Sequence, residues 1–132
     1  MTTELWVLLA SAILMLVMPT IYGPGFIKAV GSDKMLGNRD NMPAIEGWFA
    51  RGKRAHANLG ENLIPFAAVV LVAHAAGVHT GWTRAAAIVF LLARLAHGAS
   101  YFGGIGRPRA VAYVAGLVAT LVLAVAVVVN AG

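Results

Sequence analysis

Four apolar runs constrain this chain more than any other feature, because each is long enough to cross a bilayer. They cover residues 5–22, 55–78, 82–102 and 110–129 of the 132-residue chain, and about 20 apolar residues suffice for a membrane-spanning helix. Inside a bilayer, only helices and closed barrels satisfy every backbone polar group. We therefore predict an all-α integral membrane protein, a bundle of four transmembrane helices that forms one domain over residues 1–132.

The composition is typical of a membrane protein and argues against several kinds of functional site. Hydrophobic residues make up 60% of the chain and charged residues 11%, whereas about a quarter of the residues in soluble domains are charged. The chain has no cysteine, which excludes a disulfide framework and a protein thiolate. No histidine pair has metal-ligand spacing on one polar face, so we predict no metal. The net charge of +5 comes without a nucleic-acid-binding motif, so we expect no nucleic acid partner.

Two features of the first apolar run bear on how it is interpreted. A signal peptide would begin with basic residues, but the segment before Leu5 holds Glu4 and no lysine or arginine. We therefore predict a transmembrane helix. Pro19 and the cluster Tyr22-Gly23-Pro24-Gly25 predict that this helix ends or kinks there.

Basic residues are divided unequally among the three loops. Six lie between the first two runs, one lies between the second and third, and two lie between the last two. In that order they are Lys28, Lys34, Arg39, Arg51, Lys53 and Arg54; Arg84; and Arg107 and Arg109. Loops rich in lysine and arginine stay in the cytoplasm. We therefore predict that the first and third loops are cytoplasmic and that both termini are outside.

A polar stripe enters the second run from its cytoplasmic end. Arg51, Arg54, Asn58 and Glu61 are spaced three, four and three residues apart, so they share one face of a helix, with Asn62 at its edge. This stripe is too polar to face lipid, and it must face protein or a cavity.

The third and fourth runs carry matching stripes near the same end. Arg94, His97 and Tyr101 are spaced three and four apart in the third run, and Arg109 and Tyr113 are one turn apart at the start of the fourth. Arg94 lies inside a span and cannot lose its charge, so it needs a partner, a wet cavity or a bound anion.

An ion pair between Glu61 and Arg94 is the simplest arrangement that leaves neither charge unpaired. Both residues lie roughly 10 Å inside the cytoplasmic boundary, at about 1.5 Å per residue. Arg51, Arg54 and Arg109 then exceed the carboxylates available to neutralise them. This excess of guanidinium groups indicates an anionic ligand.

A purely structural interpretation accounts for the same residues one by one. Arg51, Lys53 and Arg54 fit the role of orientation signals, and Tyr101 and Tyr113 fit that of interfacial aromatic residues. The expected ion pair would then only stabilise the fold. Convergence of all these groups on one side and at one depth favours a binding site.

The second run carries the pattern Arg51-x-x-Arg54-Ala-His56-x-Asn58-x-x-Glu61-Asn62-x-x-Pro65-Phe66. This pattern resembles the signature of the MAPEG family, the membrane-associated proteins in eicosanoid and glutathione metabolism. Two downstream patterns, Arg94-x-x-His97-x-x-x-Tyr101 and Pro108-Arg109-x-x-x-Tyr113, look like further signatures of that family. Residues 37–40, reading GNRD, look like its shorter bacterial members. The resemblance covers the chain from about residue 37 onward.

The resemblance implies a four-helix subunit in a homotrimer, with glutathione bound between subunits near the cytoplasmic face. It also implies a bacterial inner membrane. The residues that match positions lining or bracing the glutathione site are Arg51, Arg54, His56, Asn58, Glu61, Arg94 and Tyr101. Arg109 matches the arginine that stabilises the glutathione thiolate, and Tyr113 matches a neighbouring contact.

Three departures from the family pattern bear on the chemistry. Leu59 stands where the family often has aspartate, and Ala110 stands where a serine often follows the catalytic arginine. The loop before the fourth run is short, so Arg107 competes with Arg109 for the catalytic position.

The resemblance implies a glutathione-dependent transferase or peroxidase, in which Arg109 stabilises the thiolate with help from Tyr113 or Tyr101. A lipophilic electrophile or hydroperoxide would enter from the bilayer. Two alternatives stay open. One is a proton-coupled transporter with Glu61 as its carrier carboxylate, although surrounding arginines would hold that group ionised and repel cationic substrates. The other is a catalytically silent protein that binds glutathione or lipid.

Overall fold

The computed structural model describes residues 1–131, and these contain five helices and no strand. The helices are α1 (Thr3–Val30), α2 (Ser32–Leu36), α3 (Trp48–Ala75), α4 (Gly81–Gly103) and α5 (Gly106–Asn130). Four of them, α1, α3, α4 and α5, are long and apolar enough to cross a membrane. The predicted all-α architecture with four candidate membrane spans is confirmed.

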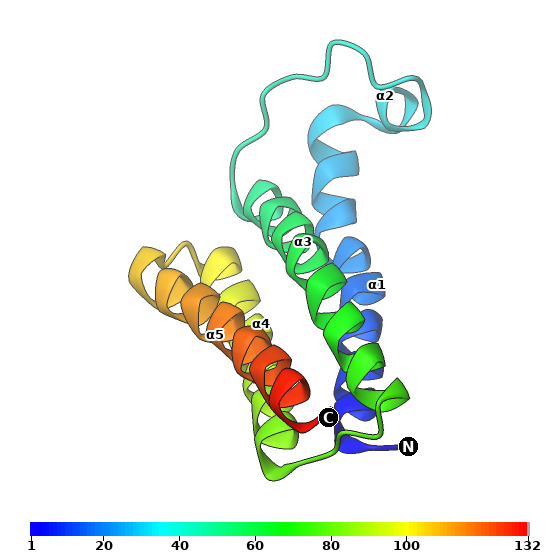
Figure 1. The fold of residues 1–132 in the computed structure, drawn as a ribbon. Helices are drawn as coiled ribbons and strands as arrows, with labels where there is room; N and C mark the ends of the chain where they lie inside the picture. The colour runs from blue at the N-terminus through cyan, green and yellow to red at the C-terminus, as the bar shows by residue number, and fades with distance from the viewer. Residues whose placement is uncertain (132) are drawn as a thin grey trace.

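The four long helices run along one another as two neighbouring pairs (Figure 1). Helix α1 packs against α3, and α4 packs closely against α5. Both chain termini and the α3–α4 turn lie at one end of the bundle, which we call the terminal end (Figure 1). The short helix α2, the segment 37–47 and the α4–α5 turn lie at the opposite end, which we call the loop end.

Helix α1 is longer than predicted. It continues through Pro19 and Pro24 to Val30. Of the two predicted outcomes, an end or a kink, the end near residue 22 is therefore wrong. Proline removes one backbone donor, but membrane helices tolerate it where neighbouring helices and hydroxyl groups satisfy the freed backbone groups. Helix α3 likewise begins at Trp48 rather than near residue 55, because its polar first turns interrupt the apolar run without interrupting the helix.

Two stacked phenylalanines form the centre of the core. The rings of Phe66 in α3 and Phe90 in α4 lie parallel with centroids 3.7 Å apart, and both side chains are fully buried. Val70 and Leu123 pack in the same cluster, so it joins α3, α4 and α5. The cluster fixes the relative positions of the three helices that carry the polar stripes.

A buried acidic residue joins α1 to α4 at the terminal end. Glu4 is 1% exposed, and its Oε1 accepts a hydrogen bond from the hydroxyl of Thr83. Thr83 also forms a reciprocal capping box with Thr80 at the start of α4, and Nδ1 of His79 lies 3.8 Å from Oε2 of Glu4. This contact was not predicted from the sequence, because its partners are 79 residues apart.

Candidate functional site: a basic pocket at the loop end

Arg51 joins the start of α3 to the end of α4. Its Nε donates to the backbone carbonyl of Tyr101 at 3.0 Å, and its Nη2 donates to that of Phe102 at 3.1 Å. These carbonyls belong to the last turn of α4, where the i+4 amide partners of the helix interior are missing. The carbonyl of Tyr101 also accepts from the N–H of Gly104. Gly104 ends the helix with a φ of 71°, in the left-handed conformation that glycine favours. Arg51 therefore fixes two helix ends against each other.

Arg94 lies inside the bundle and is only 3% exposed. Its Nη1 donates to Oδ1 of Asn58 in α3 at 3.2 Å, and its Nη2 donates to the backbone carbonyl of Tyr113 in α5 at 3.0 Å. Glu61 is exposed, and residues 1–131 contain no ion pair between it and Arg94. The predicted Glu61–Arg94 pair is therefore wrong. Asn58 lies on the same helical stripe as Glu61, one turn closer to the loop end. Its side-chain amide is the partner of Arg94, in place of the predicted Glu61 carboxylate.

A glycine in α5 makes room for Arg94. A Cβ atom at Gly116 would overlap the guanidinium group, with its Cζ only 2.7 Å away. The same guanidinium lies beside the rings of Phe90 and Tyr113, with Cζ 5.4 and 5.7 Å from their centroids. Glycine permits this close approach because it has no side chain. Arg94 therefore connects α3, α4 and α5 at the depth where the polar stripes meet.

Three arginines surround a small pocket at the loop end. It has a volume of about 90 Å³, and none of its lining residues is acidic; they are Arg51, Arg54, Ser100, Tyr101, Gly104, Ile105, Gly106 and Arg109. The Cζ atom of Arg109 lies 4.9 Å from the ring centroid of Tyr101. Within residues 1–131, none of these arginines forms an ion pair. Such a pocket is suited to a carboxylate or another anion.

Arg107 and Arg109 lie in different environments. Arg109 is half-buried in the basic pocket, whereas Arg107 lines an apolar groove between α4 and α5 together with Leu92, Pro108 and Val111. The two arginines are two residues apart on a helix, so their side chains point about 200° apart around its axis. Arg109 is therefore the one that accompanies Tyr101 and Arg54.

Other predicted site residues lie outside the lining of the basic pocket. The Nδ1 atom of His56 lies 2.9 Å from the hydroxyl of Tyr22, so the imidazole faces α1. Tyr113 is 38% exposed on the surface of a single chain. His97 is buried, with its ring 5.0 Å from that of Tyr101. The pocket thus combines the predicted residues Arg51, Arg54, Tyr101 and Arg109.

Ser100 also lines the pocket, although the sequence pattern did not indicate it. It lies between the predicted positions His97 and Tyr101, and its spacing of six residues from Arg94 placed it outside the expected stripe. Hydrogen bonds in the turn after α4 hold Ser100 at the pocket. The N–H of Gly104 donates to the carbonyl of Tyr101, and the N–H of Ile105 donates to that of Ser100.

The MAPEG family model matches residues 3–129 of the chain. This match covers the four candidate spans, apart from the last residue of α5, and every residue of the basic pocket. No curated protein matches the sequence. The match agrees with the resemblance of the polar patterns in α3, α4 and α5. The chain therefore belongs to the MAPEG family, the membrane-associated proteins in eicosanoid and glutathione metabolism.

Proposed function

We propose that this protein is a glutathione-dependent membrane transferase or peroxidase whose thiol-binding site includes the basic pocket. The observation that carries the proposal is the grouping of Arg51, Arg54 and Arg109 around one pocket without an acidic lining residue. Glutathione at neutral pH carries two carboxylates and one ammonium group, so it is a net anion. Guanidinium groups bind carboxylates in a bidentate manner.

Arg54 is the residue that we expect to hold a glutathione carboxylate. It is exposed and forms no ion pair among the described residues, so its charge is available to a ligand. Arg51 already donates to two carbonyls of α4, and it adds positive charge while fixing the pocket wall. Arg94 acts through Asn58 and Tyr113, which it holds by hydrogen bonds. His56 and Glu61 complete the proposed set of binding or bracing residues.

Arg109 is the proposed catalytic residue. A guanidinium close to a thiol stabilises the thiolate and lowers its pKa from the usual value of about 8.5. Packing against the Tyr101 ring holds this guanidinium beside the pocket. The hydroxyl of Tyr101 or of Tyr113 then supplies a hydrogen bond to the sulfur. Since the chain has no cysteine, the thiol must come from the bound peptide.

The second substrate is proposed to be a lipophilic electrophile or hydroperoxide that enters from the bilayer. In conjugation, the thiol loses its proton and the sulfur bonds to an electrophilic carbon. A displaced group departs as its anion, whereas the oxygen of an opened ring takes up a proton. In peroxide reduction, two glutathione molecules become the disulfide while the hydroperoxide becomes an alcohol and water. Both reactions use the same thiolate, so the proposed roles of Arg109 and Arg54 are the same in each.

A homotrimer fits this proposal, because the basic pocket in one chain is too small for the ligand. Its volume is about 90 Å³, whereas sites for small-molecule ligands occupy about 300–1,000 Å³. A neighbouring subunit would supply the remaining wall. We place the pocket toward the cytoplasm and the termini outside, in a bacterial inner membrane, on the basis of the charge distribution and the family resemblance.

Glutathione binding to the detergent-solubilised protein, measured by calorimetry, tests the proposal. We expect binding in the wild type and a loss of about tenfold or more in Arg54→Gln, since a charge-assisted hydrogen bond contributes about 1.5–3 kcal/mol. Lys34→Gln removes an exposed charge outside the pocket and should bind as the wild type does. Equal weakening by both substitutions would show only a general effect of charge and would contradict the assignment.

A catalytically silent glutathione-binding protein is the second candidate. Arg51 and Arg94 both use their N–H groups on protein oxygens, which favours a structural role for two of the basic residues. Such a protein would bind glutathione without lowering the thiol pKa, so the thiol titration distinguishes it from the enzyme.

A further inference from the structure

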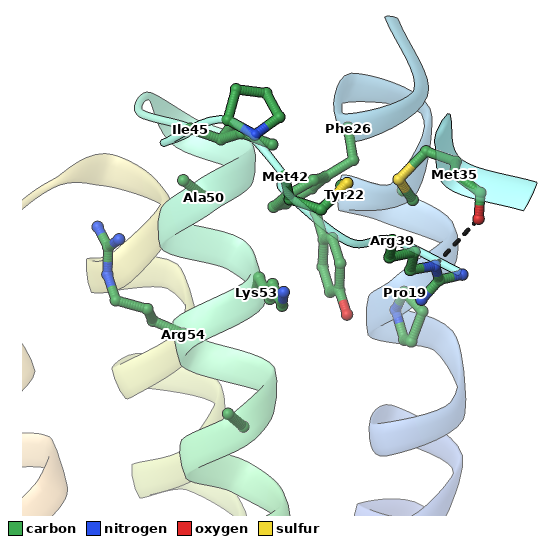
Figure 2. Close-up of a pocket in the computed structure, with 13 residues that line it drawn as sticks. Pro19, Tyr22, Phe26, Met35, Arg39, Met42, Ile45, Ala50, Lys53 and Arg54 are labelled. Atoms are coloured by element: carbon green, nitrogen blue, oxygen red, sulfur yellow. Dashed lines mark hydrogen bonds between the residues drawn. The ribbon is translucent and has the colours of Figure 1, made fainter. Parts of the chain in front are cut away.

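A second and larger cavity lies at the loop end between α1 and α3 (Figure 2). Its volume is about 790 Å³, within the range of about 300–1,000 Å³ that ligand sites occupy. The second half of α1 forms one wall, the first turns of α3 form the other, and the segment 35–45 covers it. Most of its lining is apolar, including Phe26, Met35, Met42 and Ile45.

Small residues at three positions of the facing helices leave space for this cavity. The α1 wall is formed by residues 19, 22, 23 and 26, and the α3 wall by residues 50, 53, 54 and 57. Both sets have the spacing of one helix face. Larger residues such as Tyr22 and Phe26 form part of the walls. Gly23, Ala50 and Ala57 have little or no side chain, so the space beside them stays unfilled.

Basic side chains accompany the apolar walls. Lys53 and Arg39 line the cavity, and none of its lining residues is acidic. Lys53 Nζ lies 5.5 Å from the ring centroid of Phe26, and Arg39 Nε donates to the carbonyl of Met35 at 3.0 Å. Neither residue forms an ion pair within residues 1–131. Figure 2 shows Lys53 on the α3 side of the space, and Arg39 beside α1.

We propose that this cavity binds an anionic phospholipid of the surrounding bilayer. The phosphate would lie by Lys53 and Arg39, and the acyl chain would lie against Phe26 and the apolar wall of α1. Basic pockets between membrane helices near the headgroup layer bind anionic headgroups, and Lys53 lies in the second turn of α3, near the loop end of a candidate membrane span. A soluble anion would leave the apolar walls exposed to water. A ligand that has both an anionic headgroup and an apolar chain therefore fits the cavity better.

This site is separate from the proposed glutathione site except at Arg54, which lines both cavities. Tests of the lipid site therefore leave Arg54 unchanged. Lys53 and Arg39 do not line the basic pocket, so glutathione binding should persist in their variants. The two proposals can fail independently.

The test is a titration of detergent-purified protein with phosphatidylglycerol or phosphatidylcholine of the same acyl chains, read by native mass spectrometry. We expect the wild type to bind phosphatidylglycerol about 25-fold more tightly than phosphatidylcholine, since two basic side chains each contribute about fivefold. Lys53→Gln and Arg39→Gln should each weaken phosphatidylglycerol binding about fivefold, the effect of roughly one basic side chain near an anionic headgroup. Phosphatidylcholine binding should change little. Lys28→Gln and Lys34→Gln, which alter exposed lysines outside the cavity, are the matched controls.

A second variant fills the cavity without changing its charge. A Cβ at Gly23 would meet no atom within 4 Å, so Gly23→Leu should fold and should weaken the binding of both lipids. Ala29→Leu introduces the same side chain at an exposed position of α1 outside the cavity and should change the binding of neither lipid. Equal binding of the two lipids by the wild type, equal effects of Lys53→Gln and Lys34→Gln, or unaltered binding in Gly23→Leu would each overturn the proposal. Competition by free glycerol phosphate at the affinity of the lipid would also overturn it.

Discussion

Arg109 lies over the ring of Tyr101, with its Cζ 4.9 Å from the ring centroid. The contact joins the first turn of α5 to the last turn of α4 across the short turn at Gly104 and Ile105. Cation–π contacts of this kind contribute about 0.5–1 kcal/mol at exposed sites. The contact holds one guanidinium at the basic pocket, whereas Arg107 turns to another face of α5.

Arg109→Ala is expected to lower kcat with a soluble model electrophile about 100-fold, the usual cost of removing one group that stabilises developing negative charge. Glutathione binding should be largely retained, because Arg51 and Arg54 remain. The measurement is steady-state turnover together with calorimetric binding. Arg107→Ala is the control and should keep its kcat. Loss of turnover in the Arg107 variant but not in the Arg109 variant would show that Arg107, and not Arg109, is the catalytic residue.

Gly116→Ala is expected to destabilise the protein by about 1–3 kcal/mol, the usual cost of forcing an extra methyl group into a packed site. The new Cβ would displace the Arg94 guanidinium and so weaken its bonds to Asn58 and to the carbonyl of Tyr113. Thermal unfolding in detergent measures the effect. Gly98→Ala, also in a helix but with no atom within 4 Å of the added Cβ, should not lower Tm. Equal stability of the two variants would contradict the packing described for Arg94.

Arg51→Lys is expected to loosen the end of α4. A lysine has no planar fork, and it cannot reproduce the two hydrogen bonds to Tyr101 and Phe102. Amide exchange over residues 101–105 should become faster, with a loss of stability of about 1 kcal/mol. Arg54→Lys changes a neighbouring arginine that donates to neither carbonyl, and exchange there should stay the same. Unchanged exchange in the Arg51 variant would remove its proposed bracing role.

Glu4→Ala is expected to destabilise the terminal end by about 1–3 kcal/mol, since Thr83 loses a buried acceptor. Glutathione affinity should not change, because the basic pocket lies at the loop end. Glu46→Ala alters an exposed glutamate. It should change the free energy of unfolding by no more than about 0.5 kcal/mol. A thermal shift no larger than that of the Glu46 variant would show that the Glu4–Thr83 contact contributes little.

Sequence periodicity predicted the helices and most of the pocket because both depend on local spacing. The apolar runs gave the four spans, and the stripes brought Arg51, Arg54, Tyr101 and Arg109 to one end of the bundle. The limits of α1 and α3 were harder to predict, because Pro19 and Pro24 break helices in water more readily than in a bundle, and because the first turns of α3 are polar.

Contacts between distant helices were predicted less well. Spacing shows which residues share a face, but the choice between Asn58 and Glu61 as the partner of Arg94 depends on how far one helix is shifted along another. The contact between Glu4 and Thr83 was not predicted for the same reason, since it too depends on how two helices are placed along each other. Gly116 also gave no sequence signal, since its importance appears only when the Arg94 guanidinium lies against it.

The most direct test of the proposed activity is the ultraviolet absorbance of the glutathione thiolate across pH, in the presence of the wild-type protein in detergent. We predict that bound glutathione titrates well below the usual thiol pKa of about 8.5, and that Arg109→Ala returns the thiol pKa toward that value. Bound glutathione whose thiol titrates at its ordinary pKa, or no binding at millimolar glutathione, would contradict the proposed thiolate activation.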